Sequence, residues 1–208
     1  FEDTADAYII NTCSVTAVSD KKSRQMIRRA KGRNPGAVVA ACGCYVQTHT
    51  DEAESLGIDL VGGTGERMKF LDLLEQAAAD RRARVLVDEA LRRRDFEVLP
   101  AGGQARRTRA MLKVEDGCTN FCAYCIIPMI RGRFRSRPEE AILAEAENLA
   151  QAGMKELIVV AQDITRYGLD LYGRRTLAQL LPKLCAIEGI QWVRLHYLYP
   201  DEITDELI

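Results

Sequence analysis

Short apolar runs alternate with amphipathic segments along the first eighty residues of the chain. The apolar runs predict buried strands at residues 7–10, 37–41 and 58–61, and the segments between and after them predict helices at 19–32 and 66–79. Turn-forming residues such as Asn34-Pro35-Gly36 separate these elements. Strands that alternate with helices are typical of a parallel sheet in an α/β layer structure.

The same alternation returns after residue 108. Strands are predicted at 110–114, 157–161 and 192–197, with helices from 137 to about 153, at 176–187 and from Asp201 onward. Consecutive β-α units of this kind match the first half of a barrel, in which functional residues follow the strands.

The stretch between these two parts is rich in arginine and has one short strand candidate at residues 84–87. We interpret it as a connector. The predicted organisation is therefore an incomplete α/β parallel-sheet domain at 1–80, a linker at 81–107 and a partial TIM-type barrel at 108–208.

Three cysteines, Cys118, Cys122 and Cys125, lie within eight residues of one another. Three thiolates can hold three corners of a four-iron cubane and leave the fourth iron open, whereas ferredoxin-type runs supply a fourth Cys. An open iron can chelate the amino and carboxylate groups of S-adenosylmethionine, and an electron then generates a 5′-deoxyadenosyl radical. The spacing Cys-x3-Cys-x2-Cys, with Tyr124 before the last Cys, resembles the signature of the radical-SAM superfamily.

Two other interpretations of the cysteine cluster are a structural zinc site and a disulfide set. Zinc usually takes four ligands, and the two histidines of the chain, His49 and His196, lie far from the cluster in sequence. An odd number of closely spaced cysteines, in a chain without a secretory segment, disfavours disulfides. A non-catalytic iron–sulfur or zinc-binding module is the alternative from another functional class.

Composition adds limited information about compartment and partners. The 208 residues are 47% hydrophobic with a net charge of −1, and no apolar run approaches a membrane span. Seven cysteines without a signal peptide favour a reducing compartment, so we expect a cytoplasmic protein. Residues 21–33 hold seven Lys or Arg and no acid, which fits either phosphate binding or a solvated helix face. Because the chain starts with Phe1 and ends at a predicted helix start, we expect a fragment.

Two further motifs narrow the resemblance. Asn11-Thr12-Cys13 and Gly43-Cys44-Tyr45, together with the Cys118 triplet, resemble the methylthiotransferases, which are radical-SAM enzymes with a second [4Fe-4S] cluster in the first domain. The resemblance implies that Cys13 and Cys44 are two ligands of this auxiliary cluster and that the third lies upstream of Phe1. We interpret Cys42 as a packing residue and Cys185, by its helical spacing, as a core residue.

The resemblance also implies a division of labour between the two clusters. One cluster makes the radical that removes an unactivated hydrogen, the other presents sulfur, and S-adenosylmethionine serves as both radical source and methyl donor. Tyr124 corresponds to a position against the adenine, while Gln162 and Asp163 lie where the methionine end is commonly contacted. No catalytic residue is assigned beyond the cluster ligands, and an electron donor such as flavodoxin or ferredoxin is expected.

The two halves of the chain resemble different branches of the family. The segment around Cys13 and the loop up to Pro128 resemble enzymes that modify threonylcarbamoyladenosine at position 37 of tRNA. Residues 161–168, 171–173 and 192–200 resemble enzymes that modify an aspartate of ribosomal protein S12. The mixture fits a divergent member or a chimera of two related genes. We favour tRNA as the substrate and keep the ribosomal protein as the alternative.

Overall fold

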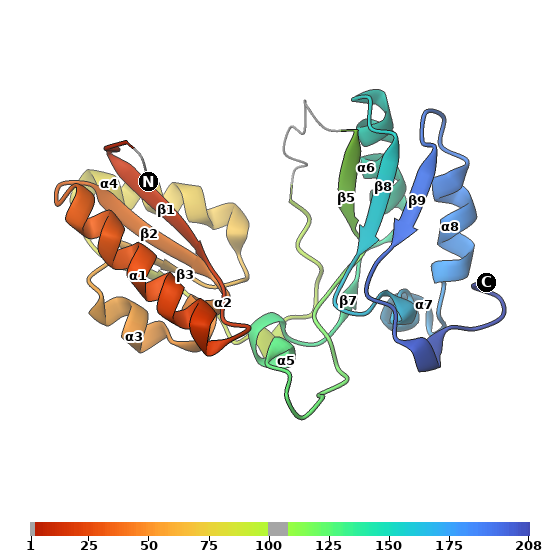
Figure 1. The fold of residues 1–208 in the computed structure, drawn as a ribbon, viewed down its shortest axis with the longest axis horizontal. Coiled ribbons are helices and arrows are strands. Elements are labelled where there is room, and N and C mark those ends of the chain that lie inside the picture. The colour runs from red at the N-terminus through yellow and green to blue at the C-terminus, as the bar shows by residue number, and fades with distance from the viewer. Residues whose placement is uncertain (1–2, 100–107) are drawn as a thin grey trace. The chain divides into compact units, whose positions relative to one another are not determined.

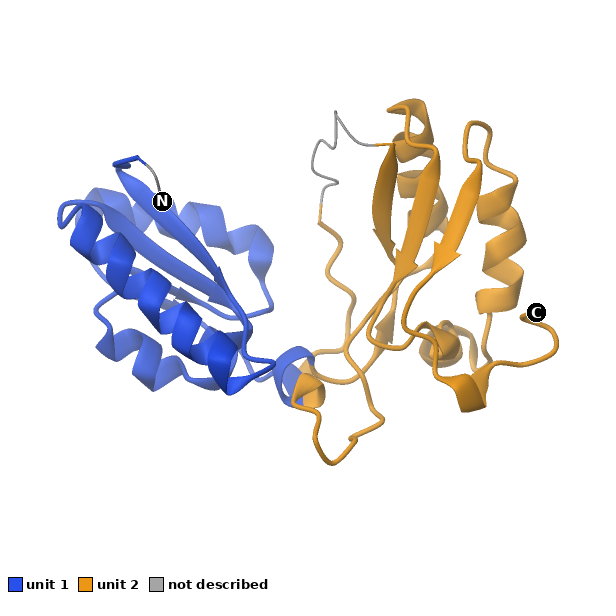
Figure 2. Ribbon diagram, in the orientation of Figure 1, with its two compact units in different colours: residues 1–91, 129–131 blue, residues 92–128, 132–208 orange. Residues whose placement is uncertain are grey.

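The computed structural model describes residues 3–99 and 108–208 of the chain (Figure 1). It divides into two compact units, which are coloured separately in Figure 2. The first unit comprises Phe1–Leu91 with Met129–Arg131, and the second comprises Arg92–Pro128 with Gly132–Ile208. Each unit is built on a parallel sheet of its own, so the expected α/β class is confirmed.

Four parallel strands form the sheet of the first unit, in the order of the sequence. They are β1 (Ala7–Thr12), β2 (Val38–Gly43), β3 (Leu60–Gly62) and β4 (Arg84–Leu86). The fourth strand lies inside the segment that we expected to be a connector. It belongs to the sheet because its backbone pairs with β3, and the division between the units falls after Leu91.

Helices cover both faces of this sheet. They are α1 (Ala17–Arg33), α2 (Cys44–Thr48), α3 (Thr50–Ser55) and α4 (Phe70–Asp80), with 3-10 turns η1 (Arg67–Lys69) and η2 (Ala90–Arg92). Alternate residues of β2 point to opposite faces. Val39 packs with Ile27 of α1 on one face, and Val38 packs with Leu74 of α4 on the other. Burial on both faces explains why β2 is a continuous apolar run.

The second unit has three parallel strands in the order β5 (Arg109–Lys113), β8 (Glu156–Val160) and β9 (Trp192–Leu195). Its other elements are α5 (Ile127–Arg131, which it shares with the first unit), α6 (Glu139–Gln151), η3 (Ile164–Arg166), α7 (Leu169–Tyr172), α8 (Leu177–Cys185) and η4 (Pro200–Glu202). The core lies between the sheet and helices α6 and α8, with Leu112 and Leu180 fully buried. The helix expected from Asp201 is only the single turn η4.

A two-stranded hairpin follows the first barrel strand and was missed by the sequence analysis. Strand β6 (Glu115–Asp116) pairs antiparallel with β7 (Arg135–Ser136). Two residues are too few to give a periodic pattern, so this pairing is invisible until the chain is folded. An ion pair of 3.5 Å joins Asp116 to Arg135 across the hairpin. The hairpin therefore joins the two ends of the segment that contains the three clustered cysteines.

Candidate functional site

The loop with the three cysteines begins at a glycine that cannot be replaced without strain. Gly117 has a φ of 86°, and a Cβ there would lie 2.2 Å from the carbonyl oxygen of Arg133. This close approach brings the loop against the far side of the hairpin, where the Cys118 N–H donates to the Gly132 carbonyl at 3.1 Å. The position of Cys118 is therefore fixed by backbone contacts with the segment just before β7.

Cys118, Cys122 and Cys125 all line one cavity of about 150 Å³ in the second unit, and each is partly exposed. Among the described residues, no group of three His, Cys, Asp or Glu side chains is arranged to hold a single metal ion. A cubane takes each thiolate on a different iron, so its ligands surround the cluster and do not meet at one point. Three thiols around one cavity therefore fit such a cluster better than they fit a single zinc ion.

Two features of its surroundings shift the pKa of the Cys118 thiol in opposite directions. Burial raises the pKa of Cys118 above its ordinary value, and the backbone N–H of Asn120, 3.5 Å from the sulfur, acts against this shift. A thiol with a raised pKa stays protonated at neutral pH until a metal displaces the proton. The N–H of Asn120 is aimed at the sulfur and would stabilise the charged thiolate form.

The positions expected to contact S-adenosylmethionine differ in their access to this cavity. Tyr124 is 90% exposed and lines the cavity, so its ring is open to a partner. Gln162 also lines the cavity, and its Oε1 accepts the Gly117 N–H at 2.8 Å. Asp163 is only 3% exposed and is not among the residues that line the cavity. The assignment of these three residues to the cofactor stays a prediction.

Tyr199 is a residue of the cavity that sequence reasoning missed. It lies just before η4, and its hydroxyl oxygen is 3.6 Å from the sulfur of Cys122. The proximity of Cys122 raises the pKa of the Tyr199 hydroxyl. The sequence shows only two tyrosines, Tyr197 and Tyr199, on either side of Leu198, and gives no sign that one of them reaches a cysteine so far away in the chain.

Cys13 and Cys44 lie at the same edge of the first sheet. Strands β1 and β2 are parallel with Thr12 opposite Gly43, and each cysteine is the next residue after this pair. The carboxyl edge of a parallel sheet is where α/β proteins usually bind ligands. Gly43 has a φ of 102°, and a Cβ there would lie 2.6 Å from the Thr12 carbonyl oxygen. The two strands therefore come too close at this point for any residue but glycine.

A buried serine of α1 holds the backbone of Cys13. The Ser23 hydroxyl accepts from the Cys13 N–H at 3.3 Å and donates to the Cys13 carbonyl at 3.2 Å. With its backbone tied on both sides, Cys13 leaves its side chain exposed. Cys44 is partly exposed at the first residue of α2. Both thiols are accessible, as a pair of ligands for an auxiliary cluster requires.

Two further cysteines, Cys42 and Cys185, were expected to be structural residues, and they differ in how far they are buried. Cys42 is partly buried in β2 beside Gly62, and burial raises the pKa of its thiol. Cys185 was expected in the core, and this prediction is wrong because Cys185 is exposed at the end of α8. Leu184 takes the buried position, so the next residue is turned by about 100° around the helix and faces outward.

Two family models match the chain, one for each unit. Residues 1–63 match the family described as "Uncharacterized protein family UPF0004", and residues 112–208 match the "Radical SAM superfamily". A solved structure of a radical S-adenosylmethionine methyltransferase, TsrM from Kitasatospora setae with cobalamin and a [4Fe-4S] cluster bound, shares the fold. The superposition has a TM-score of 0.56 at 17% identity and covers 88% of this chain and 41% of that one. The family match, and not this likeness of fold, identifies residues 112–208 as a radical-SAM domain.

Curated relatives narrow the assignment from the radical-SAM superfamily to the methylthiotransferases. The threonylcarbamoyladenosine tRNA methylthiotransferase MtaB of Bacillus subtilis is 41% identical over 100% of this chain and 46% of its own length. The ribosomal protein uS12 methylthiotransferase RimO of Desulfitobacterium hafniense is also 41% identical, over 98% of this chain and 47% of its own length. The chain belongs to the radical-SAM methylthiotransferase family and spans about half the length of these relatives.

The family membership confirms two of the expectations from the sequence. Its members are enzymes, and the expected cofactor class, an iron–sulfur cluster with S-adenosylmethionine, belongs to the family. Among the described residues, no helix is both long enough and apolar enough to cross a membrane. The cytoplasmic location stays a prediction.

Proposed function

We propose that this chain is the part of a methylthiotransferase that generates the radical, and that the whole protein inserts a methylthio group at C2 of N6-threonylcarbamoyladenosine 37 in tRNA. The observation that supports the radical chemistry is the cavity bordered by Cys118, Cys122 and Cys125. When bound there, the cluster supplies the electron that cleaves S-adenosylmethionine to methionine and a 5′-deoxyadenosyl radical.

The residues of this chain have separable roles in the proposal. The three thiolates hold three irons, and Tyr124, which is exposed at the cavity, offers an aromatic face to the adenine. Gln162 reaches the edge of the cavity from the end of β8; its Oε1 accepts the Gly117 N–H, so its Nε2 is the atom proposed to contact the methionine end of the cofactor. Cys13 and Cys44 are two of three ligands of an auxiliary cluster that delivers sulfur.

The radical chemistry is tested by anaerobic reconstitution of the purified chain with iron and sulfide. The reduced protein should convert S-adenosylmethionine to methionine and 5′-deoxyadenosine. Cys122→Ala should abolish the cleavage, whereas Cys185→Ala, at an exposed cysteine remote from the cavity in sequence, should leave it unchanged. Cleavage by Cys122→Ala at the parent rate would refute the assignment.

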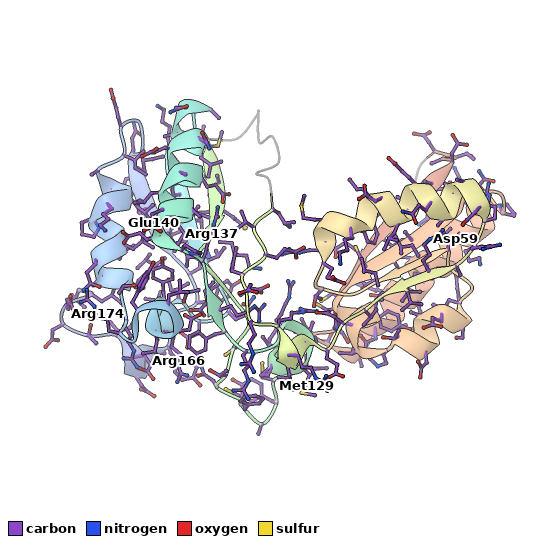
Figure 3. The ribbon with its side chains drawn as sticks, turned by 180° about the vertical axis from the view of Figure 1, so that it is seen from behind. Asp59, Met129, Arg137, Glu140, Arg166 and Arg174 are labelled. Atoms are coloured by element: carbon purple, nitrogen blue, oxygen red, sulfur yellow. The ribbon has the colours of Figure 1, made fainter. Side chains whose placement is uncertain are left out.

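The preference for tRNA draws support from the surface of α1. Lys21, Lys22, Arg28 and Arg29 are exposed on this helix, whereas Arg24 is engaged with Glu52 and the Tyr45 ring. Exposed cations of this kind can neutralise phosphates, which makes binding depend strongly on salt. The double variant Arg28→Ala/Arg29→Ala of the full-length protein should bind tRNA more weakly and with a shallower salt dependence than the parent. The exposed Arg174 of the second unit (Figure 3) provides a matched control, Arg174→Ala.

Ribosomal protein S12 is the second candidate substrate. Residues 161–168 resemble the protein-modifying branch, and Gln162 of this segment borders the cavity. The relatives include both branches at the same identity. Deletion of the gene, followed by mass spectrometry of tRNA nucleosides and of ribosomal proteins, distinguishes the two. Loss of the methylthio group from the S12 aspartate alone would reverse the preference. The electron donor, a flavodoxin or ferredoxin, is also a proposal.

A further inference from the structure

The loop that carries the three cysteines has little secondary structure of its own. Residues 117–126 contain neither helix nor strand. The Cys118 N–H bonds outside the loop, to the Gly132 carbonyl. The Cys125 N–H bonds within the loop, to the Cys122 carbonyl at 2.9 Å. Phe121 adopts a φ of 47°, a left-handed conformation that is costly for an aromatic residue. The shape of the loop therefore depends on side-chain contacts from other segments.

Those contacts come from the turn that follows β8. The Asn120 amide nitrogen donates to Asp163 Oδ2 at 3.0 Å, and Arg166 Nη1 donates to the Thr119 hydroxyl at 3.4 Å. Both bonds reach residues directly after Cys118 in the loop. The Gln162 contact with Gly117, described above, lies directly before it. The turn thus holds the loop on both sides of its first cysteine.

Asp163 is itself held rigidly. Its Oδ1 accepts from the Thr165 N–H at 3.2 Å, which caps the turn η3, and its Oδ2 lies 3.9 Å from Arg166 Nε. Arg166 is in turn 3.7 Å from Glu202. Both oxygens of the buried Asp163 carboxylate are therefore engaged within the protein. A side chain with this arrangement fixes its neighbours and is poorly placed to bind a ligand in the cavity.

We propose that Asp163, with Arg166, is a positioning residue that holds the Cys118 loop in the shape that receives the cluster. Asp163 then affects S-adenosylmethionine only through the loop and does not contact it. The inference rests on the proposed function for the identity of the bound group. The hydrogen bonds to Thr119 and Asn120 are independent of that function.

The effect of the contacts can be measured before any cluster is added. A hydrogen bond to a charged group contributes enough to change a local equilibrium by about ten- to a hundredfold, and a neutral one by about two- to tenfold. Asn120→Ala removes the donor and leaves Asp163 in place. Asp163→Asn keeps the shape but turns an amide towards donors, either Asn120 or the Thr165 N–H. Both variants should loosen the loop.

The first measurement is amide hydrogen exchange of the purified chain without iron. Peptides covering residues 117–125 should exchange at least about twofold faster in Asn120→Ala and Asp163→Asn than in the parent. Asp205→Asn is the matched control because this carboxylate of the second unit is exposed and lies outside the hairpin and the turn that hold the loop. It should leave exchange in the loop unchanged.

The second measurement follows reconstitution of the same variants. Iron bound per chain and the electron paramagnetic resonance spectrum of the reduced cluster should change in both loop variants. Affinity for S-adenosylmethionine, expressed per cluster formed, should stay within about twofold of the parent. If Asp163→Asn keeps parental exchange and iron content but loses affinity, Asp163 contacts the cofactor and the inference is overturned. Parental exchange in both variants also overturns it. If the parent binds no cluster while exchange responds as expected, the positioning role stands and the proposed function fails.

Discussion

The sulfur of Cys122 lies 3.6 Å from the hydroxyl oxygen of Tyr199, which is 77 residues further along the chain. The contact joins the cysteine loop to the segment after the third barrel strand, within one cavity. A hydroxyl this close can donate a hydrogen bond to a metal-bound thiolate. Hydrogen bonds to the sulfurs are among the factors that set the reduction potential of an iron–sulfur cluster.

Replacement of Tyr199 by Phe should therefore make the cluster harder to reduce. Loss of the donor removes stabilisation of the more negative, reduced form, so the midpoint potential should become more negative. Redox titration of the reconstituted protein, followed by electron paramagnetic resonance, measures the change. Tyr197→Phe is the control, since Tyr197 is 65% exposed and packs against His196. An unchanged potential in Tyr199→Phe would show that the contact does not persist once the cluster is bound.

Replacement of Gly117 by Ala should destabilise the second unit strongly. The new Cβ would lie 2.2 Å from the Arg133 carbonyl oxygen, in addition to the cost of a positive φ. Gly153 has a φ of 91° with nothing within 4 Å of its virtual Cβ, so Gly153→Ala incurs only the backbone cost of roughly 1 to 2 kcal/mol. Urea unfolding of both variants should show the larger loss for Gly117→Ala. Equal losses would contradict the close approach.

Removal of the Ser23 hydroxyl should loosen Cys13. Ser23→Ala leaves the Cys13 N–H and carbonyl without their side-chain partner, at a cost of about 1 to 2 kcal/mol in the free energy of unfolding. Amide exchange at Cys13 should accelerate in parallel. The control Ser55→Ala removes an exposed hydroxyl from α3 and should change the stability by less than about 0.5 kcal/mol. Equal effects of the two substitutions would count against a specific role for Ser23.

In the full-length parent, the double variant Cys13→Ala/Cys44→Ala should lose one cluster. Iron per reconstituted chain should fall from about eight to about four, the counts for two cubanes and for one. Cys42→Ser provides the control, because Cys42 lies two residues from Cys44 but is partly buried in β2. Retention of about eight irons by the double variant, or equal loss in the control, would refute the auxiliary assignment.

Glu115 should make the stability of the second unit fall as the pH rises. Burial, followed by repulsion from Asp163 and Asp170, raises the pKa of this carboxyl to about 9, and neither of its oxygens has a hydrogen-bond partner among residues 3–99 and 108–208. Arg166 lowers the pKa and Asp116 raises it, both more weakly. The folded state therefore keeps a proton that the unfolded state loses above its ordinary pKa of about 4.5.

The resulting penalty on folding grows between about pH 4.5 and pH 9. Glu115→Gln cannot ionise, so its stability relative to the parent should increase over this range. Urea unfolding of both proteins at pH 6 and pH 8.5 tests the prediction. Parallel stabilities at the two pH values would show that Glu115 is ionised in the folded protein.

The periodic elements were the part of the fold that the sequence could predict. The strands at 37–41 and 157–161 and the helix at 19–32 are long apolar or amphipathic patterns, and all three are present in the structure within a few residues. The hairpin β6–β7 was missed because it is held by pairing across a loop and has no pattern of its own. Similarly, β4 was noted as a strand candidate but assigned to a connector, because a three-residue strand within an arginine-rich stretch carries little signal.

The residues of the site also differ in whether the sequence alone could predict them. Cys118, Cys122 and Cys125 are close in sequence, so their shared cavity could be predicted from spacing. Tyr199 and the Asn120–Asp163 hydrogen bond depend on tertiary structure, which brings distant segments together. No local pattern encodes such contacts. Cys185 was misplaced for a different reason, since hydrophobic neighbours on a helix do not tell which way a terminal residue faces.

The pairing of Thr12 with Gly43 has a consequence for how this family can vary in length. A single inserted or deleted residue within β1 or β2 would shift one cysteine past the other and turn alternate side chains to the wrong face. Residues added in the turn between α1 and β2 would leave the two strand ends level. Natural insertions and deletions in the first eighty residues should therefore be found in the loops and be excluded from these two strands. The hydrogen bonds between β1 and β2 therefore fix how far apart Cys13 and Cys44 lie at the edge of the sheet.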